Sequence, residues 1–129
     1  MAYPSGSGSE ILRRGSMHNH VTAETTFKFD GTHPTVGTAT DTVPANHIIT
    51  IVSIFITDMS NAAMHFTMRH IISTVEYVIL KEASIPAKGT YVWNDPIVVH
   101  GGDTLKINAD SQSGANFDVY YSYIDQDWT

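Results

Sequence analysis

Short runs of β-branched and aromatic residues, separated by turn-forming residues, recur along most of this 129-residue chain. The clearest run is 47–57 (HIITIVSIFIT), which is apolar on both faces of an extended chain, so we expect a central strand there. Similar runs predict further strands at 22–29, 64–72, 75–81, 90–93, 97–99, 104–109 and 117–124. Gly, Pro, Asn and Asp gather between these runs, and the stretch 30–42 (DGTHPTVGTATDT) predicts a long loop.

The pattern predicts an all-β protein. No stretch repeats apolar residues at the i, i+3, i+4, i+7 spacing of an amphipathic helix between helix caps. About eight strands at regular spacing predict an antiparallel β-sandwich, and we expect a jelly-roll-like topology. The length suits one domain with its own core, so we place a β-sandwich domain at 16–129 after an extended N-terminal arm at 1–15.

The arm is predicted from the segment 2–15 (AYPSGSGSEILRRG), in which small and flexible residues dominate. A secretory signal peptide needs a basic start and then about 7–15 apolar residues. Here no Lys or Arg precedes Arg13, and Ile11 and Leu12 are the whole apolar run. We therefore interpret this segment as a natural arm that fits against the surface of another protein.

Composition excludes several kinds of partner. The net charge is −6 and there is no basic block, so we expect no nucleic-acid partner. No run approaches about 18 consecutive apolar residues, so we expect no membrane partner. Cysteine is absent, which leaves neither disulfides nor thiolate chemistry. Charged residues make up only 16% of the chain, and this low share suggests that part of the surface does not face water.

Residues that could carry chemistry are present but do not form a recognisable site. The tripeptide 18–20 (HNH) would place two imidazoles on one side of a strand, where they could meet a metal ion. The other histidines do not follow a ligand spacing, so we expect exposed strand histidines instead. The acid pairs Asp125/Asp127 and Asp95/Asp103 are interpreted as solvated tips. Neither G-x-S-x-G nor S-x-x-K occurs, and we expect no catalytic residue, no metal site, no cofactor and no enzymatic activity.

Aromatic residues crowd the last predicted strand. Tyr121 and Tyr123 share one face of it and Tyr120 lies on the other, so one face belongs to the core and the other places phenol groups outside. Exposed Tyr and Trp side chains on a sheet are typical of sugar binding and of protein contact. An alternative function is therefore a carbohydrate-binding sandwich that uses Tyr121 and Tyr123 with Trp93 and Trp128 on one flat face. Cross-strand packing inside the domain is the other interpretation of these rings.

Three segments occur in an informative order. The segment 43–58 (VPANHIITIVSIFITD) begins a strand after a V-P-A turn. The segment 81–107 (KEASIPAKGTYVWNDPIVVHGGDTLKI) passes through an I-P-A loop to a G-D-T-L-K turn and strand, and 116–125 (NFDVYYSYID) closes the series. In this order they resemble small β-sandwich accessory proteins of tailed bacteriophage virions, namely capsid decoration (cement) proteins and related neck, collar or fibre-base domains.

The resemblance implies a non-enzymatic structural protein that binds the assembled shell and stabilises it through many repeated contacts. Its partners would be other virion proteins, either the major capsid protein or neck and portal-proximal proteins. It would also form a homo-oligomer, a trimer rather than a dimer. It would be made in the host cytoplasm and end in the virion. A neck, collar or tail-fibre-base component is an alternative location for the same kind of protein.

Extended termini are common in such proteins, so the arm is the first candidate for partner contact. Its apolar pair would fill a small pocket and its arginines would pair with carboxylates. The contact residues that we expect in the arm are Tyr3, Ile11, Leu12, Arg13 and Arg14, followed by His33 and Pro34 in the long loop and by Trp128 near the end. A third possibility, a small hydrolase on a sandwich scaffold, would need a concave site with a His–carboxylate pair.

Overall fold

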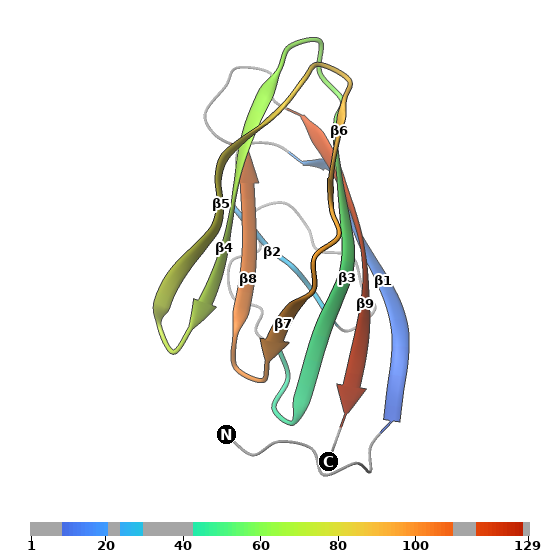
Figure 1. The fold of residues 1–129 in the computed structure, drawn as a ribbon, viewed down its shortest axis with the longest axis vertical. Helices are drawn as coiled ribbons and strands as arrows, with labels where there is room; N and C mark the ends of the chain where they lie inside the picture. Colours follow the sequence, from blue (N-terminus) through green and yellow to red (C-terminus); the bar gives the residue numbers. More distant parts are fainter. Residues whose placement is uncertain (1–8, 21–23, 30–42, 110–115, 128–129) are drawn as a thin grey trace.

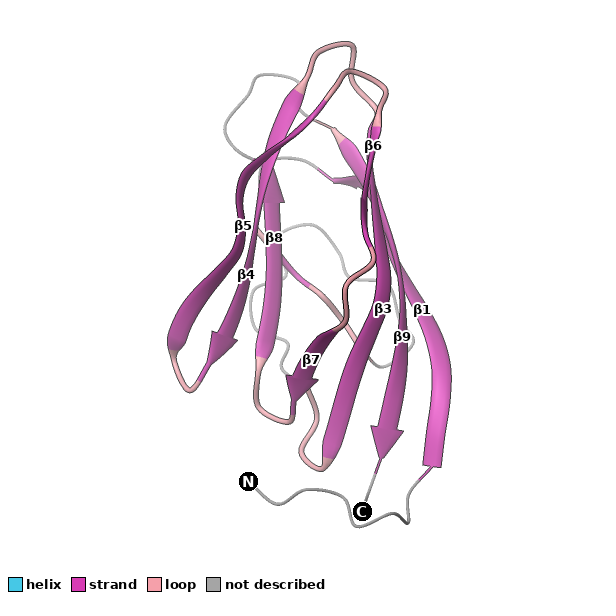
Figure 2. Cartoon of the chain, viewed as in Figure 1, coloured by secondary structure: helices cyan, strands magenta, loops and turns pink. Residues whose placement is uncertain are grey.

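Two antiparallel β-sheets lie face to face in the computed structural model, which describes residues 9–20, 24–29, 43–109 and 116–127 (Figure 1). In these residues the chain forms strands, turns and loops, with no helix (Figure 2). The first sheet contains β1 (Ser9–His20), β9 (Phe117–Asp127), β3 (His47–Asp58), β6 (Thr90–Trp93) and β7 (Ile97–His100). The second sheet contains β2 (Thr25–Thr26), β8 (Thr104–Ala109), β4 (Met64–Ile72) and β5 (Val75–Ile85). The all-β prediction is confirmed.

The strand order is that of a jelly roll. β6 pairs with the second half of β3 and β7 with the first half, so together they form one edge that is interrupted at 94–96. The interruption contains Pro96, which has no N–H group for a ladder hydrogen bond. Each sheet then has four positions, in the orders β1-β9-β3-β6/β7 and β2-β8-β4-β5. The predicted topology of about eight strands is confirmed, with one strand split in two.

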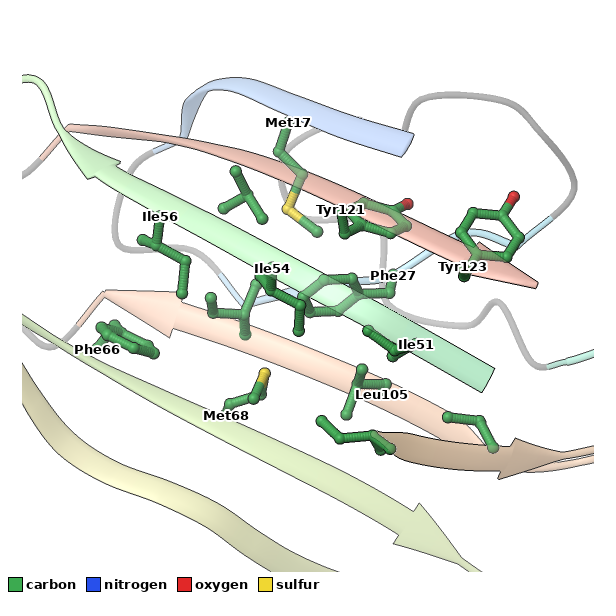
Figure 3. Close-up of a cluster of buried hydrophobic side chains, with 14 of the residues drawn as sticks. Met17, Phe27, Ile51, Ile54, Ile56, Phe66, Met68, Leu105, Tyr121 and Tyr123 are labelled. Carbon is green, nitrogen blue, oxygen red and sulfur yellow. The ribbon is translucent and has the colours of Figure 1, made fainter. Parts of the chain in front are cut away.

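The core lies between the two sheets (Figure 3). β9 alternates along its length, and Phe117, Val119, Tyr121 and Tyr123 all point inward and are buried. The ring of Phe27 meets the ring of Tyr121 edge to face, with 4.8 Å between centroids. Burying one side chain of this size contributes about 1.5–3 kcal/mol, so this aromatic cluster is a large part of what holds the sheets together.

β3 is central in its sheet, as its sequence predicts, because β9 pairs with one edge of it and β6 and β7 with the other. The inward side chains, such as Ile54 and Ile56, are fully buried. The outward face of β3 carries the exposed side chains of Val52 and Phe55 among hydroxyl side chains such as Thr57. The largely apolar run therefore marks a central strand here, but only one of its faces is covered by the described residues.

The N-terminal region differs from the sequence-based expectation. The predicted arm ends at residue 15, whereas β1 runs without a break from Ser9 to His20 and pairs with β9. Residues 9–15 are thus part of the sandwich, because their backbone groups complete the ladder of β9. The remaining arm residues, 1–8 with Tyr3 among them, lie outside the described residues.

Two other predicted elements change length. Residues 24–29 are the described part of the predicted strand 22–29, and within them the strand is limited to Thr25–Thr26, although the N–H of Phe27 still donates to the carbonyl of Leu105 at 2.8 Å. The predicted strand 75–81 continues to Ile85, past an irregular pairing with β4 where the N–H of Glu82 donates to Thr67 Oγ1. The predicted loop 30–42 lies outside the described part of the chain.

Candidate functional site

β1 carries four of the expected contact residues at one edge of the first sheet. Leu12 is 73% exposed and Ile11 is 45% exposed, and Leu12 is the most exposed large apolar side chain in the described residues. Arg14 is also exposed. Among the described strands β1 pairs only with β9, so its other edge presents backbone donors and acceptors that an added strand could use.

Arg13 has its carboxylate partner inside its own chain. Its Nε lies 3.4 Å from Oδ2 of Asp125, which is buried on β9. His47 at the start of β3 reaches the other oxygen, with Nδ1 2.6 Å from Oδ1 of Asp125. His47 Nε2 also lies 3.7 Å from Asp127 Oδ2. The expected role of Arg13 was pairing with a partner's carboxylate, but in this structure Arg13 ties β1 to β9 near one end of the sandwich.

Gly15 allows β1 to lie close to the core. A Cβ atom at Gly15 would lie 2.2 Å from Cζ of the Tyr121 ring, so any side chain here requires the ring to move. The hydroxyl of Tyr121 in turn donates to the carbonyl of Lys28 at 2.7 Å and accepts from its N–H at 3.2 Å. Tyr121 therefore connects β1, β9 and the segment 24–29.

The expected contact residues His33, Pro34 and Trp128 lie outside the described residues.

Two of the four aromatic residues considered for sugar binding are buried. Tyr121 and Tyr123 are fully buried, which agrees with cross-strand packing inside the domain and contradicts the alternative that they form a sugar-binding face. Trp93 is half-buried against the core, and its Nε1–H donates to the carbonyl of Asp95 at 2.8 Å. The exposed ring of β9 is that of Tyr120, whose cross-strand neighbour on β3 is Phe55. Alternation along β9 predicts that Tyr121 and Tyr123 lie on one face of the strand and Tyr120 on the other. It does not tell which of these faces is covered.

His18, the first residue of the 18–20 tripeptide, lies beside a carboxylate of the neighbouring strand. His18 is exposed and its Nδ1 lies 3.1 Å from Oδ1 of Asp118 on the neighbouring strand. No set of three or more His, Asp and Glu side chains in the described ranges comes together in a way that suits a metal ion.

A third histidine–carboxylate pair lines a hollow at the end of the sandwich near the β4–β5 turn. Nε2 of His70 lies 3.1 Å from Oδ2 of Asp103, and both side chains are buried. The hollow has a volume of about 380 Å³, and Ser73 and His100 also line it. Oδ2 of Asp103 additionally accepts from the backbone N–H of His100 at 3.1 Å. The pair therefore ties β4 to the β7–β8 turn, and it is also the feature that a hydrolase on this scaffold would need.

The β4–β5 hairpin presents a further apolar surface. Its two strands end in the two-residue turn Ser73–Thr74, and the exposed side chains around it are Ile72, Val75, Tyr77 and Val78. β5 is the edge of the second sheet. A long apolar edge strand is prone to pair with another chain unless something covers it.

The chain has no match among known family models, curated proteins or solved structures. No helix with the length and apolarity needed to cross a membrane occurs in the part of the chain that the structure describes.

Proposed function

We propose that this chain is a non-enzymatic structural protein of a tailed phage virion, a capsid decoration protein that binds the assembled shell and stabilises it. The sequence resemblance over 43–125 and the jelly-roll order of the strands support the proposal. The observation that carries it is the edge strand β1, with Leu12 and Ile11 exposed on a strand whose second edge pairs with no other described strand. Such an edge can add to a strand of the shell, and many copies of a modest contact give firm attachment.

The proposal includes self-association and a place in the virion after synthesis in the host cytoplasm. The exposed apolar side chains of the β4–β5 hairpin support the homo-oligomer, because burying them would remove them from water. A trimer is favoured over a dimer. A neck, collar or fibre-base location would use the same edge strand against a different virion protein.

The test is co-sedimentation of the purified chain with shells assembled from the major capsid protein of the same genome. Deleting 2–15 would remove half of β1 and uncover β9, so a substitution and a shorter deletion are better probes. Leu12→Asp is expected to weaken binding to shells by about tenfold or more, because it places a charge where binding to the shell would bury an apolar side chain. Val98→Asp, at an exposed position on the opposite edge of the same sheet, is the matched control and should bind normally.

Deleting 2–8 keeps every described strand and is expected to weaken binding as well. If Leu12→Asp and the 2–8 deletion both bind shells as well as the unchanged chain does, the decoration proposal is wrong. Binding to isolated neck rings instead of shells would place the same contact at the neck.

The absence of enzymatic activity has a separate test at the His70–Asp103 pair. The unchanged chain is expected to hydrolyse p-nitrophenyl acetate no faster than the His70→Ala variant does. A hydrolysis rate that is lost in His70→Ala and in Ser73→Ala, while both variants stay folded, would contradict a purely structural role.

A further inference from the structure

The outward face of the first sheet carries a hollow that no part of the proposed structural role requires. It has a volume of about 290 Å³ and is lined by side chains of β1, β9 and β3. The register places Ser16, Tyr120 and Phe55 side by side across these three strands, and Val92 of β6 continues the row. All of them lie on the solvent side of the sheet, opposite the core.

A second row of polar side chains runs beside this apolar row. It lies two residues along each strand from the apolar row. There Asp118 of β9 is opposite Thr57 of β3, and Thr57 is opposite Thr90 of β6. Their side-chain contacts are short: His18 Nδ1 lies 3.1 Å from Asp118 Oδ1, and the Thr57 and Thr90 hydroxyls are 3.0 Å apart. Since residues two apart on a strand are separated by about 6.6 Å, the polar row lies directly beside the rings.

The two rings are exposed and are inclined to each other. Tyr120 is 43% and Phe55 is 38% exposed, and their centroids are 6.3 Å apart with 39° between the ring planes. Exposed rings on a sheet provide flat apolar platforms that are otherwise costly to leave in water. A carboxylate accepts hydrogen bonds, while hydroxyls both donate and accept them.

We infer that this surface, built from Tyr120, Phe55, His18, Asp118 and Thr57, binds a neutral saccharide. A sugar ring has an apolar face of C–H groups and an edge of hydroxyls, which matches an aromatic row beside a row of acceptors and hydroxyls. The volume is at the lower end of the range for ligand sites, and it suits one or two sugar rings better than a peptide. Its lining contains one basic side chain, His18, beside the carboxylate of Asp118, so the site has no cluster of positive charge for a phosphate or sulfate.

This inference is independent of the virion role, and it moves sugar binding from Tyr121 and Tyr123 to the opposite face of the same strand. The full chain should be titrated with maltotriose, cellotriose and mannotriose by calorimetry, with backbone amide NMR shifts to locate the site. Saturable binding of at least one of them is expected, with shifts centred on residues 16–18, 55–57 and 118–120.

Tyr120→Ala and Phe55→Ala are each expected to weaken that binding by about tenfold, whereas Tyr120→Phe keeps the ring and most of the affinity. Asp118→Asn should weaken it less than the loss of either ring does. Tyr77→Ala, which removes an even more exposed ring from β5 in the other sheet, is the matched control and should leave binding unchanged. Thermal unfolding confirms that each variant is folded.

Two results would overturn the inference. The first is the absence of saturable binding for all three saccharides, including the case in which Tyr120→Ala instead weakens co-sedimentation with shells, because the surface would then be a protein contact. The second is saccharide binding that survives the double substitution of Tyr120 and Phe55 by Ala.

Discussion

At the scale of single residues, Gly15 decides how closely β1 approaches the core. Its Cα faces the ring of Tyr121, and a methyl group there would overlap that ring. Gly15→Ala is therefore expected to lower the free energy of unfolding by about 1–3 kcal/mol, as overpacking does elsewhere. Urea denaturation followed by tyrosine fluorescence measures this. Arg14→Ala at the exposed neighbouring position is the control, and equal stability of the two variants would contradict the predicted overlap.

Asp125 is the second residue on which the N-terminal region depends. It is buried and faces both Arg13 and His47, so Asp125→Asn leaves two basic side chains with a neutral partner. We expect a loss of about 2 kcal/mol in the free energy of unfolding, because removing one member of a buried ion pair costs more than an exposed pair contributes. Asp95→Asn, at an exposed position, should change stability by less than about 0.5 kcal/mol. If both variants unfold at the same urea concentration, the cluster does not stabilise β1.

At the scale of elements, the β4–β5 turn contains removable strain. Ser73 and Thr74 both have positive φ angles, 49° and 67°, and together they form the two-residue turn of the hairpin. Asn and Gly adopt such angles more easily than Ser and the β-branched Thr do. The double substitution Ser73→Asn and Thr74→Gly is expected to raise the free energy of unfolding by about 1 kcal/mol. Thr74→Val, which keeps the β-branch, should give no gain, and a gain there would show that strain is not the cause.

Strands with a strong local pattern could be predicted from the sequence, whereas β1 could not. The β-branched and aromatic residues of β3 and β9 predict strands at these positions, and the structure has strands there. β1 contains Arg13, Arg14 and Gly15 and lacks this pattern, since it is held by β9, which lies about a hundred residues later in the chain. Arg13 finds its partner, and Tyr121 becomes buried, through contacts between residues that are far apart in the sequence. A short stretch of sequence therefore predicts neither of them. The sequence did not predict the hollow beside Tyr120 either. The alternation along 117–124 does place the Tyr120 ring on the opposite face of the strand from the neighbouring tyrosine rings.

At the scale of the whole molecule, the last strand is inserted between strands that precede it. β9 pairs with β1 on one side and with β3 on the other, so it is one of the two inner strands of the first sheet (Figure 1). A chain that ends at residue 115 is expected to remain unfolded by circular dichroism, and adding a peptide of residues 116–129 should restore the β-sheet signal. A chain without residues 2–8 is the control and should fold alone. A folded sandwich in the shortened chain would contradict this account.

The inner position of β9 also governs how the protein is made. The first sheet cannot close until β9 has been synthesised, so the edges of β1 and β3 that pair with β9 stay unpaired until then. Sheets that depend on such distant pairings fold slowly, and their exposed apolar strands can associate with other nascent chains. Slower synthesis at lower temperature should therefore raise the soluble yield of this chain, and chaperones that shield extended apolar segments should assist its folding in the cell.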